Sequence, residues 1–186
     1  MVRTLLGALA LSVMAIVPLM PSDAFAQWTA GGAASELTLD RADENSVVRL
    51  SSLVAINGQP AAAASAVYIQ FGFMGCQPCE RIATLATSLF DSRVTMLYVH
   101  LDDVLLGGMN QRAIWTQLYE TTRSGPYSEF IPVRRGSSQM MRDICGASAN
   151  PPSGVLLRPD GTVHAVLLAP GEDEARAAFE SLLAAL

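Results

Sequence analysis

Two of the three cysteines in the chain, Cys76 and Cys79, lie three positions apart in the segment FGFMGCQPCERIATL, residues 71–85. Cysteines at this spacing can supply half of a zinc site, a structural disulfide, or a dithiol that exchanges with other disulfides. The pair comes directly after an apolar run and directly before a helical pattern. The surrounding sequence has to decide among these three kinds of site.

A zinc site needs two more ligands, usually a second Cys-x-x-Cys or two histidines at close spacing. The chain offers only Cys145, His100 and His164, each isolated in the sequence, so we expect no metal. A purely structural disulfide is also disfavoured, because the loop that it closes is tiny and entropic stabilisation grows with loop length. The favoured interpretation is a working dithiol, with Cys145 as an ordinary buried free cysteine.

The position of the pair before a helix supplies the chemistry. Cys76 would lie at the helix N-terminus, where unpaired N–H groups and the helix dipole stabilise a thiolate, the nucleophilic form of cysteine. Cys79 falls on the same face one turn later, and Pro78 costs no hydrogen bond in the first turn. The spacing therefore predicts that Cys76 attacks a target disulfide and Cys79 resolves the mixed disulfide. We expect Cys76 to be the exposed thiol and Cys79 the buried one.

Hydrophobic patterning predicts the elements that position the pair. Residues 66–73 and 94–101 are β-branched and aromatic runs typical of buried strands, and residues 79–90 between them repeat apolar side chains at helical spacing. A strand, a helix and a strand in this order predict a βαβ unit with parallel strands. The helical repeat consists of Ile82, Leu85, Ala86 and Leu89. A second helix is predicted over residues 110–123.

The flanking segments extend this unit on both sides. Alternating apolar and polar residues over 36–56 predict an N-terminal strand pair, and the polar, proline-containing residues 124–137 predict a loop. A short helix follows over 138–146. The last part, from Asn150, predicts two strands joined by the turn PDG and an amphipathic helix with an acidic first turn. The fold class expected from this order is α/β.

Composition and the N-terminal residues indicate an exported globular protein. The apolar run between Arg3 and Met20 and the small residues Ala24–Ala26 match a secretory signal, so we predict a signal peptide over 1–26 and one domain over 27–186. An uncleaved membrane anchor is the less favoured interpretation. The chain has no lysine and a net charge of −5, which argues against a nucleic-acid partner. An oxidising compartment, the periplasm, is expected.

The Cys-x-x-Cys after a strand, together with the prolines in NPPSGVLLRPDG, resembles the thioredoxin superfamily, and the export signal and N-terminal hairpin resemble its TlpA-like periplasmic branch. The resemblance covers about residues 36–186. It implies a thioredoxin-like fold with an N-terminal β-hairpin extension. It also implies a cis-proline at Pro152 facing the dithiol, with Pro151 beside it in the substrate groove. No cofactor is implied beyond the redox-active disulfide.

The chain departs from the family pattern in three places. Gln70 occupies the position of a buried acidic residue in thioredoxins, and an amide cannot exchange a proton. Gly72 and Gly75 replace aromatic residues that thioredoxins place before the first cysteine. Pro151 precedes the expected cis-proline and lacks the N–H that the family offers to a substrate strand. We therefore expect weak docking of substrate by strand pairing.

The sequence thus predicts a thiol-disulfide oxidoreductase that reduces disulfides of specific exported proteins and receives electrons from a membrane or periplasmic donor protein. Gln77 and Pro78 carry no charge, and Glu80 opposes a nearby thiolate, so the pKa of Cys76 is expected near the roughly 7 of reductants. Two alternatives stay open. One is an oxidase that donates its disulfide, and the other is a metallochaperone or non-catalytic binding module.

Overall fold

The computed structural model of the chain describes residues 27–41, 46–73, 75–101 and 125–186. Within these residues a seven-stranded sheet has the strand order β2-β1-β5-β4-β3-β6-β7. The strands are β1 (Thr38–Arg41), β2 (Val47–Arg49), β3 (Ala66–Gly72), β4 (Val94–Leu101), β5 (Phe130–Gly136), β6 (Ser153–Leu157) and β7 (Val163–Leu168). The helices are α1 (Gln77–Leu89), α3 (Ser138–Cys145) and α4 (Glu172–Ala184), with a 3-10 turn at Leu50–Ser52. The predicted signal peptide and the predicted helix over 110–123 lie outside the described residues.

The predicted βαβ unit is confirmed at the centre of the sheet. Strands β3 and β4 run parallel, paired from Ala66 with Val94 to Gly72 with His100, and α1 connects them. Every residue of β3 is buried, as expected for a strand covered on both faces. The central position of β3 holds the residues that follow it, including both cysteines, at the carboxyl end of the sheet.

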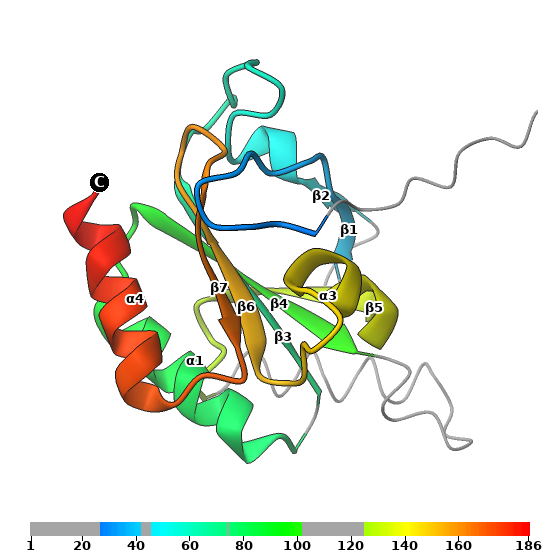
Figure 1. The fold of residues 1–186 in the computed structure, drawn as a ribbon, viewed down its shortest axis with the longest axis vertical. Helices are drawn as coiled ribbons and strands as arrows, with labels where there is room; N and C mark the ends of the chain where they lie inside the picture. Colours follow the sequence, from blue (N-terminus) through cyan, green and yellow to red (C-terminus); the bar gives the residue numbers. More distant parts are fainter. Residues whose placement is uncertain (1–26, 42–45, 74, 102–124) are drawn as a thin grey trace, which may run out of the picture.

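The N-terminal hairpin is confirmed as well. Strands β1 and β2 pair antiparallel, and β1 continues the sheet by pairing antiparallel with β5. Figure 1 shows the hairpin in blue and cyan at the end of the sheet beyond β5.

The prediction of a loop over residues 124–137 is wrong in its second half, because β5 occupies Phe130–Gly136. The strand pairs parallel with β4, and Phe130 and Val133 are buried on it. Pro132 lies outside the two residue pairs that join β5 to β1, so the missing N–H is tolerated there. The segment has only a short apolar alternation, and its proline and arginines are typical of a loop, so the sequence pattern did not predict a strand.

The C-terminal elements agree with the sequence pattern. Strands β6 and β7 form an antiparallel hairpin beside β3, and the turn between them contains Gly161 at a φ of +80°. A Cβ at Gly161 would collide with the carbonyl oxygen of Ala55, so only glycine fits this turn. Helix α4 then begins with the acidic residues Glu172, Asp173 and Glu174, which favour a helix N-terminus.

Two hydrophobic layers cover the faces of the sheet (Figure 1). On one face α1 and α4 pack over a layer that includes Tyr68, Tyr98 and Phe179. On the other face α3 and the residues before β3 pack over a layer that includes Ile69 and Phe71. Alternate residues of β3 thus serve opposite layers, as the pleat of a strand requires.

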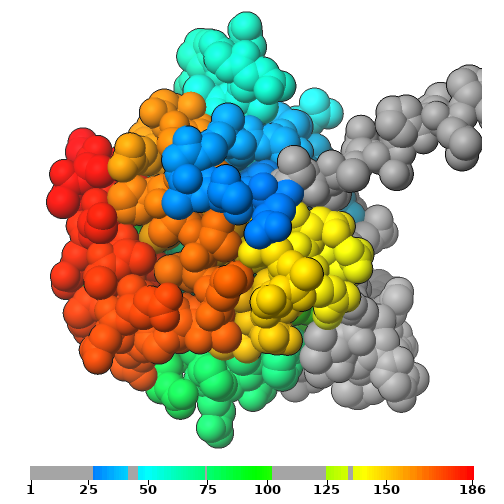
Figure 2. Space-filling model, in the orientation of Figure 1, coloured from blue at the N-terminus to red at the C-terminus, as the bar shows by residue number. Residues whose placement is uncertain are grey.

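Main-chain hydrogen bonds join the first described residues, from residue 27 on, to the rest of the fold. The Trp28 N–H donates to the Ile144 carbonyl at 2.9 Å, and the Gly31 N–H donates to the Val163 carbonyl at 2.8 Å. In Figure 2 the first described segment of the chain, in dark blue, lies between the orange region that includes β7 and the yellow region that includes α3. The chain therefore enters the fold next to α3 and closes over the start of β7.

Candidate active site

Cys76 and Cys79 form a disulfide at the start of α1, with their Cα atoms 5.2 Å apart. Cys76 is the N-cap residue of the helix, and its Sγ accepts a hydrogen bond from the Cys79 N–H at 3.2 Å. Gln77 and Pro78 between them are exposed and occupy the first turn. The sulfur of Cys76 thus takes the place of the side-chain oxygen that normally caps a helix, where the helix dipole favours negative charge.

The expected exposure of Cys76 is wrong for this disulfide form. Cys76 is 4% exposed and Cys79 is 0% exposed, so both are buried. The reason is that the Cys76 sulfur is bound back to Cys79 and to its N–H, inside the first turn of the helix. Cys76 keeps the small accessible fraction of the pair.

Gln70 lies beneath the dithiol, where the sequence placed it. Its side chain is fully buried, its Nε2 donates to the Cys79 carbonyl at 2.8 Å, and its Oε1 accepts from the Tyr68 hydroxyl at 3.2 Å. The amide therefore ties the centre of β3 to the first turn of α1. These two hydrogen bonds, to the main chain and to Tyr68, position the helix, and a neutral amide exchanges no proton.

Two tyrosines that the sequence analysis did not single out lie beside the second cysteine. Tyr98 on β4 is buried, its hydroxyl donates to the Phe73 carbonyl at 3.3 Å, and its ring lies 4.3 Å from that of Tyr127. Burial is the main cause that raises the pKa of Tyr98 well above its usual value, and burial raises the pKa of Tyr127 to about 12. Both hydroxyls therefore stay protonated at neutral pH. The alternation of inward residues along β4 was the signal that could have identified Tyr98.

Gly72 is the point where Tyr98 and the dithiol meet. A Cβ on Gly72 would lie 2.5 Å from the Tyr98 hydroxyl oxygen and 3.0 Å from the Cys79 sulfur. Real side chains do not tolerate such contacts, so a larger residue here would displace Tyr98 or Cys79. The absence of a side chain at Gly72, noted from the sequence only as a missing aromatic residue, brings the phenol close to the sulfur.

The Pro151–Pro152 peptide bond is cis in the structure. The last residue pair between β3 and β6 joins Phe71 to Ser153, so Pro152 lies one position beyond the end of this pairing. Pro152 is buried and Pro151 is partly exposed. The Ser153 hydroxyl donates to the Asn150 carbonyl at 2.6 Å and closes the chain around the two prolines.

Cys145, His100 and His164 are the residues that the sequence left outside the predicted dithiol. Cys145 is free and buried on α3, on the other face of the sheet, and burial raises the pKa of its thiol to about 12. His100 is buried on β4. On β7 the ring of His164 contacts Arg158 and Ser181. Of the three, His100 lies next to the site, because it pairs on β4 with Gly72.

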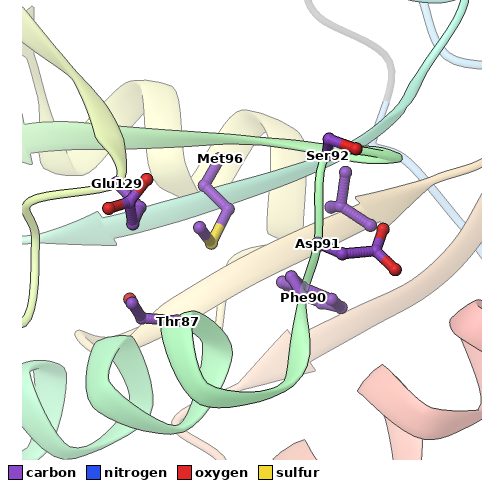
Figure 3. A pocket seen from close by; sticks show the side chains of 7 residues that line it. Thr87, Phe90, Asp91, Ser92, Met96 and Glu129 are labelled. Carbon is purple, nitrogen blue, oxygen red and sulfur yellow. The ribbon is translucent and has the colours of Figure 1, made fainter.

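A pocket of about 400 Å³ lies at the opposite end of α1 (Figure 3). Thr87 of the pocket lies eight residues after Cys79 on α1, which rises about 1.5 Å per residue, so it is about 12 Å along the helix from that cysteine. The pocket is not part of the dithiol site. It is lined by Thr87, Phe90, Asp91, Ser92, Val94, Met96 and Glu129.

The described part of the chain shows neither a cluster of metal ligands nor a membrane-spanning helix. In residues 27–41, 46–73, 75–101 and 125–186, no three His, Cys, Asp or Glu side chains group so as to hold a metal ion. Over the same ranges, each helix is too short or too polar to cross a bilayer.

No protein-family model and no curated protein matches the chain. Solved structures do. The thioredoxin domain of a thiol-disulfide oxidoreductase from Bacteroides vulgatus matches with a TM-score of 0.56 at 17% identity, covering 83% of this chain and 98% of that one. A candidate thiol:disulfide interchange protein DsbE from Chlorobium tepidum matches with a TM-score of 0.60 at 20% identity, over 86% and 99%. The exposed lipoprotein thioredoxin of Streptococcus pneumoniae matches with a TM-score of 0.53 at 16% identity, over 80% and 100%.

Sequence identity this low carries the backbone architecture and not the substrate. The match extends over most of each solved chain, with TM-scores above 0.5. The fold predicted from the sequence is confirmed: the chain has a thioredoxin-like fold.

Proposed function

We propose that the protein is a thiol-disulfide oxidoreductase that reduces disulfides of specific exported proteins through Cys76 and Cys79. One observation carries the proposal. Cys76 caps α1 and is joined to Cys79, so a disulfide that can open lies where the helix terminus stabilises the thiolate that opening releases. The names of the three similar proteins, an oxidoreductase, an interchange protein and a thioredoxin, support the same class of chemistry.

The reaction transfers two electrons from the dithiol to the target. The Cys76 thiolate attacks one sulfur of the target disulfide, an intermolecular S–S bond forms, and the other target sulfur leaves and takes up a proton. Cys79 then loses its proton and attacks Cys76. The Cys76–Cys79 bond forms, and the second target sulfur leaves and is protonated. A dithiol protein must restore the reduced pair, which makes an electron donor the second partner.

We place this reaction in the periplasm. The sequence of residues 1–26 has the three parts of a cleavable secretory signal, and one of the similar structures is named as an exposed lipoprotein. An oxidising compartment is also where a disulfide reductase has substrates. The mature domain of the proposal is residues 27–186.

Pro151 and Pro152 are proposed to form the wall of the substrate groove. Pro152 lies one position beyond the pairing between β3 and β6, at the end of the sheet that carries the cysteines. Pro151 has a carbonyl but no N–H, so a substrate strand laid against it gains one main-chain hydrogen bond fewer than against another residue. Recognition then depends on the target's side chains more than on strand pairing, which suits a reductase of few substrates.

The reducing direction can be tested through the first cysteine. We expect a pKa of Cys76 near about 7, because only the helix terminus stabilises the thiolate while Glu80 opposes it. Attack on disulfides should then speed up as pH rises through neutrality, since the thiolate fraction increases. The potential, measured by equilibration with glutathione, should lie well below the roughly −120 mV of the strongest oxidant in the superfamily. A potential near that value would instead assign the protein as an oxidase.

A trapping experiment tests the function itself. In a Cys79→Ser variant the mixed disulfide cannot be resolved, so substrate proteins should stay covalently attached to Cys76 when the variant is exported in a Gram-negative bacterium. Non-reducing electrophoresis and mass spectrometry would identify them. The matched control is Cys76→Ser with Cys79→Ser. Equal recovery from both variants would contradict the proposal, and stoichiometric metal on the purified protein would favour a metallochaperone.

A further inference from the structure

The chemistry of the second cysteine poses a problem that the first does not. Cys79 must become a thiolate to resolve the mixed disulfide, yet it is 0% exposed, and burial raises the pKa of a thiol. The residue beneath it, Gln70, donates its amide N–H to the Cys79 carbonyl rather than to the Cys79 sulfur. Some other group has to favour the charged form of Cys79.

Tyr98 has the required position. Its hydroxyl oxygen lies 2.5 Å and the Cys79 sulfur 3.0 Å from the point where a Cβ of Gly72 would stand, so the two atoms are at most about 5.5 Å apart. The hydroxyl also donates to the Phe73 carbonyl, at a long 3.3 Å, in the oxidised protein, where the sulfur carries no charge. Turning the hydroxyl hydrogen toward the sulfur, with an approach of the two side chains once the disulfide is open, exchanges that acceptor for a thiolate, which accepts a stronger hydrogen bond.

We propose that the Tyr98 hydroxyl donates a hydrogen bond to the Cys79 thiolate and thereby drives the resolving step. The inference rests on the proposed function, and it adds the residue that makes a buried second thiol reactive. The tyrosine keeps its proton throughout. The Cys79 proton leaves to water, the Cys79–Cys76 bond forms, and the departing target sulfur takes up a proton, so protons and electrons balance.

Several other titratable side chains also face the region around the Cys79 sulfur. Tyr127 packs on Tyr98, and a side-chain hydrogen bond joins the two. The charge of Glu80, from α1, acts on both tyrosines and raises the pKa of each. Tyr68, from β3, has its hydroxyl on Gln70. His100, on β4 like Tyr98, is buried and pairs with Gly72. A negative charge at Glu80 opposes a thiolate on Cys79. Among these groups Tyr98 is the one whose hydroxyl lies against Gly72 together with the Cys79 sulfur.

The test measures the acidity of Cys79 directly. In the full mature chain with Cys76→Ser and Cys145→Ala, Cys79 is the remaining thiol, and its titration can be followed by the ¹³Cβ shift of labelled cysteine. Adding Tyr98→Phe removes the hydroxyl and keeps the ring. We expect the acid dissociation constant of Cys79 to fall at least tenfold, which is one unit of pKa. With both cysteines restored, Tyr98→Phe should slow resolution of a preformed mixed disulfide at least tenfold and leave the initial attack by Cys76 unchanged.

Tyr68→Phe is the matched control, because it removes a buried hydroxyl of the same layer that binds Gln70. A shift below tenfold in Tyr98→Phe, or an equal shift in Tyr68→Phe, overturns the inference. If Tyr98→Phe does not fold, 3-fluorotyrosine at position 98 decides, since its more acidic hydroxyl must lower the pKa of Cys79; an unchanged or raised pKa counts against the inference. Turnover of the unaltered protein is assayed separately, so the proposed function can stand when this inference fails.

Discussion

Replacing Cys76 with serine is expected to slow reduction of a peptide disulfide by at least about a thousandfold, the scale of losing an essential nucleophile. Serine keeps a side-chain oxygen that can cap α1, so the helix should begin at the same residue. It cannot form a thiolate at neutral pH, and the thiolate is the group that attacks sulfur. The measurement is the rate of disulfide reduction with a small dithiol as electron source.

Cys145→Ala serves as the control for this variant. The Cys145 thiol is buried on the other face of the sheet with a pKa raised to about 12, so it stays protonated and does not compete. We expect unchanged turnover after its removal. Turnover that survives in Cys76→Ser and vanishes in Cys145→Ala would move the chemistry to a different thiol and sink the assignment of the dithiol.

Replacing Phe179 with alanine is expected to lower the free energy of unfolding by about 3–5 kcal/mol. Phe179 is fully buried, and its ring lies 5.0 Å from that of Tyr68 and 4.8 Å from that of Phe90. The substitution leaves a cavity between α4 and the sheet and removes both ring contacts. Urea unfolding followed by circular dichroism gives the difference directly.

The neighbouring residue on the same helix provides the comparison. Glu180 is exposed, and its ion pair with Arg176 at 4.0 Å is a surface pair of little value. Glu180→Ala should change stability by no more than about 0.5 kcal/mol. A loss for Phe179→Ala as small as this would mean that α4 contributes little to the hydrophobic layer, contrary to its burial.

The order of elements could be predicted because each strand and helix carries a local pattern. The β3 run from Ala66 to Gly72, the apolar repeat of α1 and the turn around Gly161 each determine their own structure. Strand β5 was missed because its stability comes from neighbours: it lies between β4 and β1, and pairing with both outweighs the poor strand propensity of Pro132. Such a strand depends on partners distant in the sequence.

The residues of the site also divide into those that a local sequence pattern predicts and those that depend on contacts with distant elements. Cys76, Cys79 and Pro78 form one continuous segment, and the spacing alone gives their places in α1. Tyr98 reaches the site from the next strand, through the parallel pairing of β3 with β4, and no short segment of sequence shows that contact. The burial of Cys76 was also hidden, since it depends on the bond to Cys79 and on the fold around the first turn of α1.

The residues before β3 have a further consequence, for self-association. Open sheet edges offer unpaired main-chain groups on which other chains can add as strands, a hazard for any protein that handles partly unfolded partners. At one edge the hairpin ends in β2, which is three residues long and contains an exposed Arg49. At the other edge Gly31 and Ala34 bond to Val163 and Gly161 and cover the start of β7. The residues before β3 therefore reduce the open length of both sheet edges, where other chains could pair as strands and aggregate.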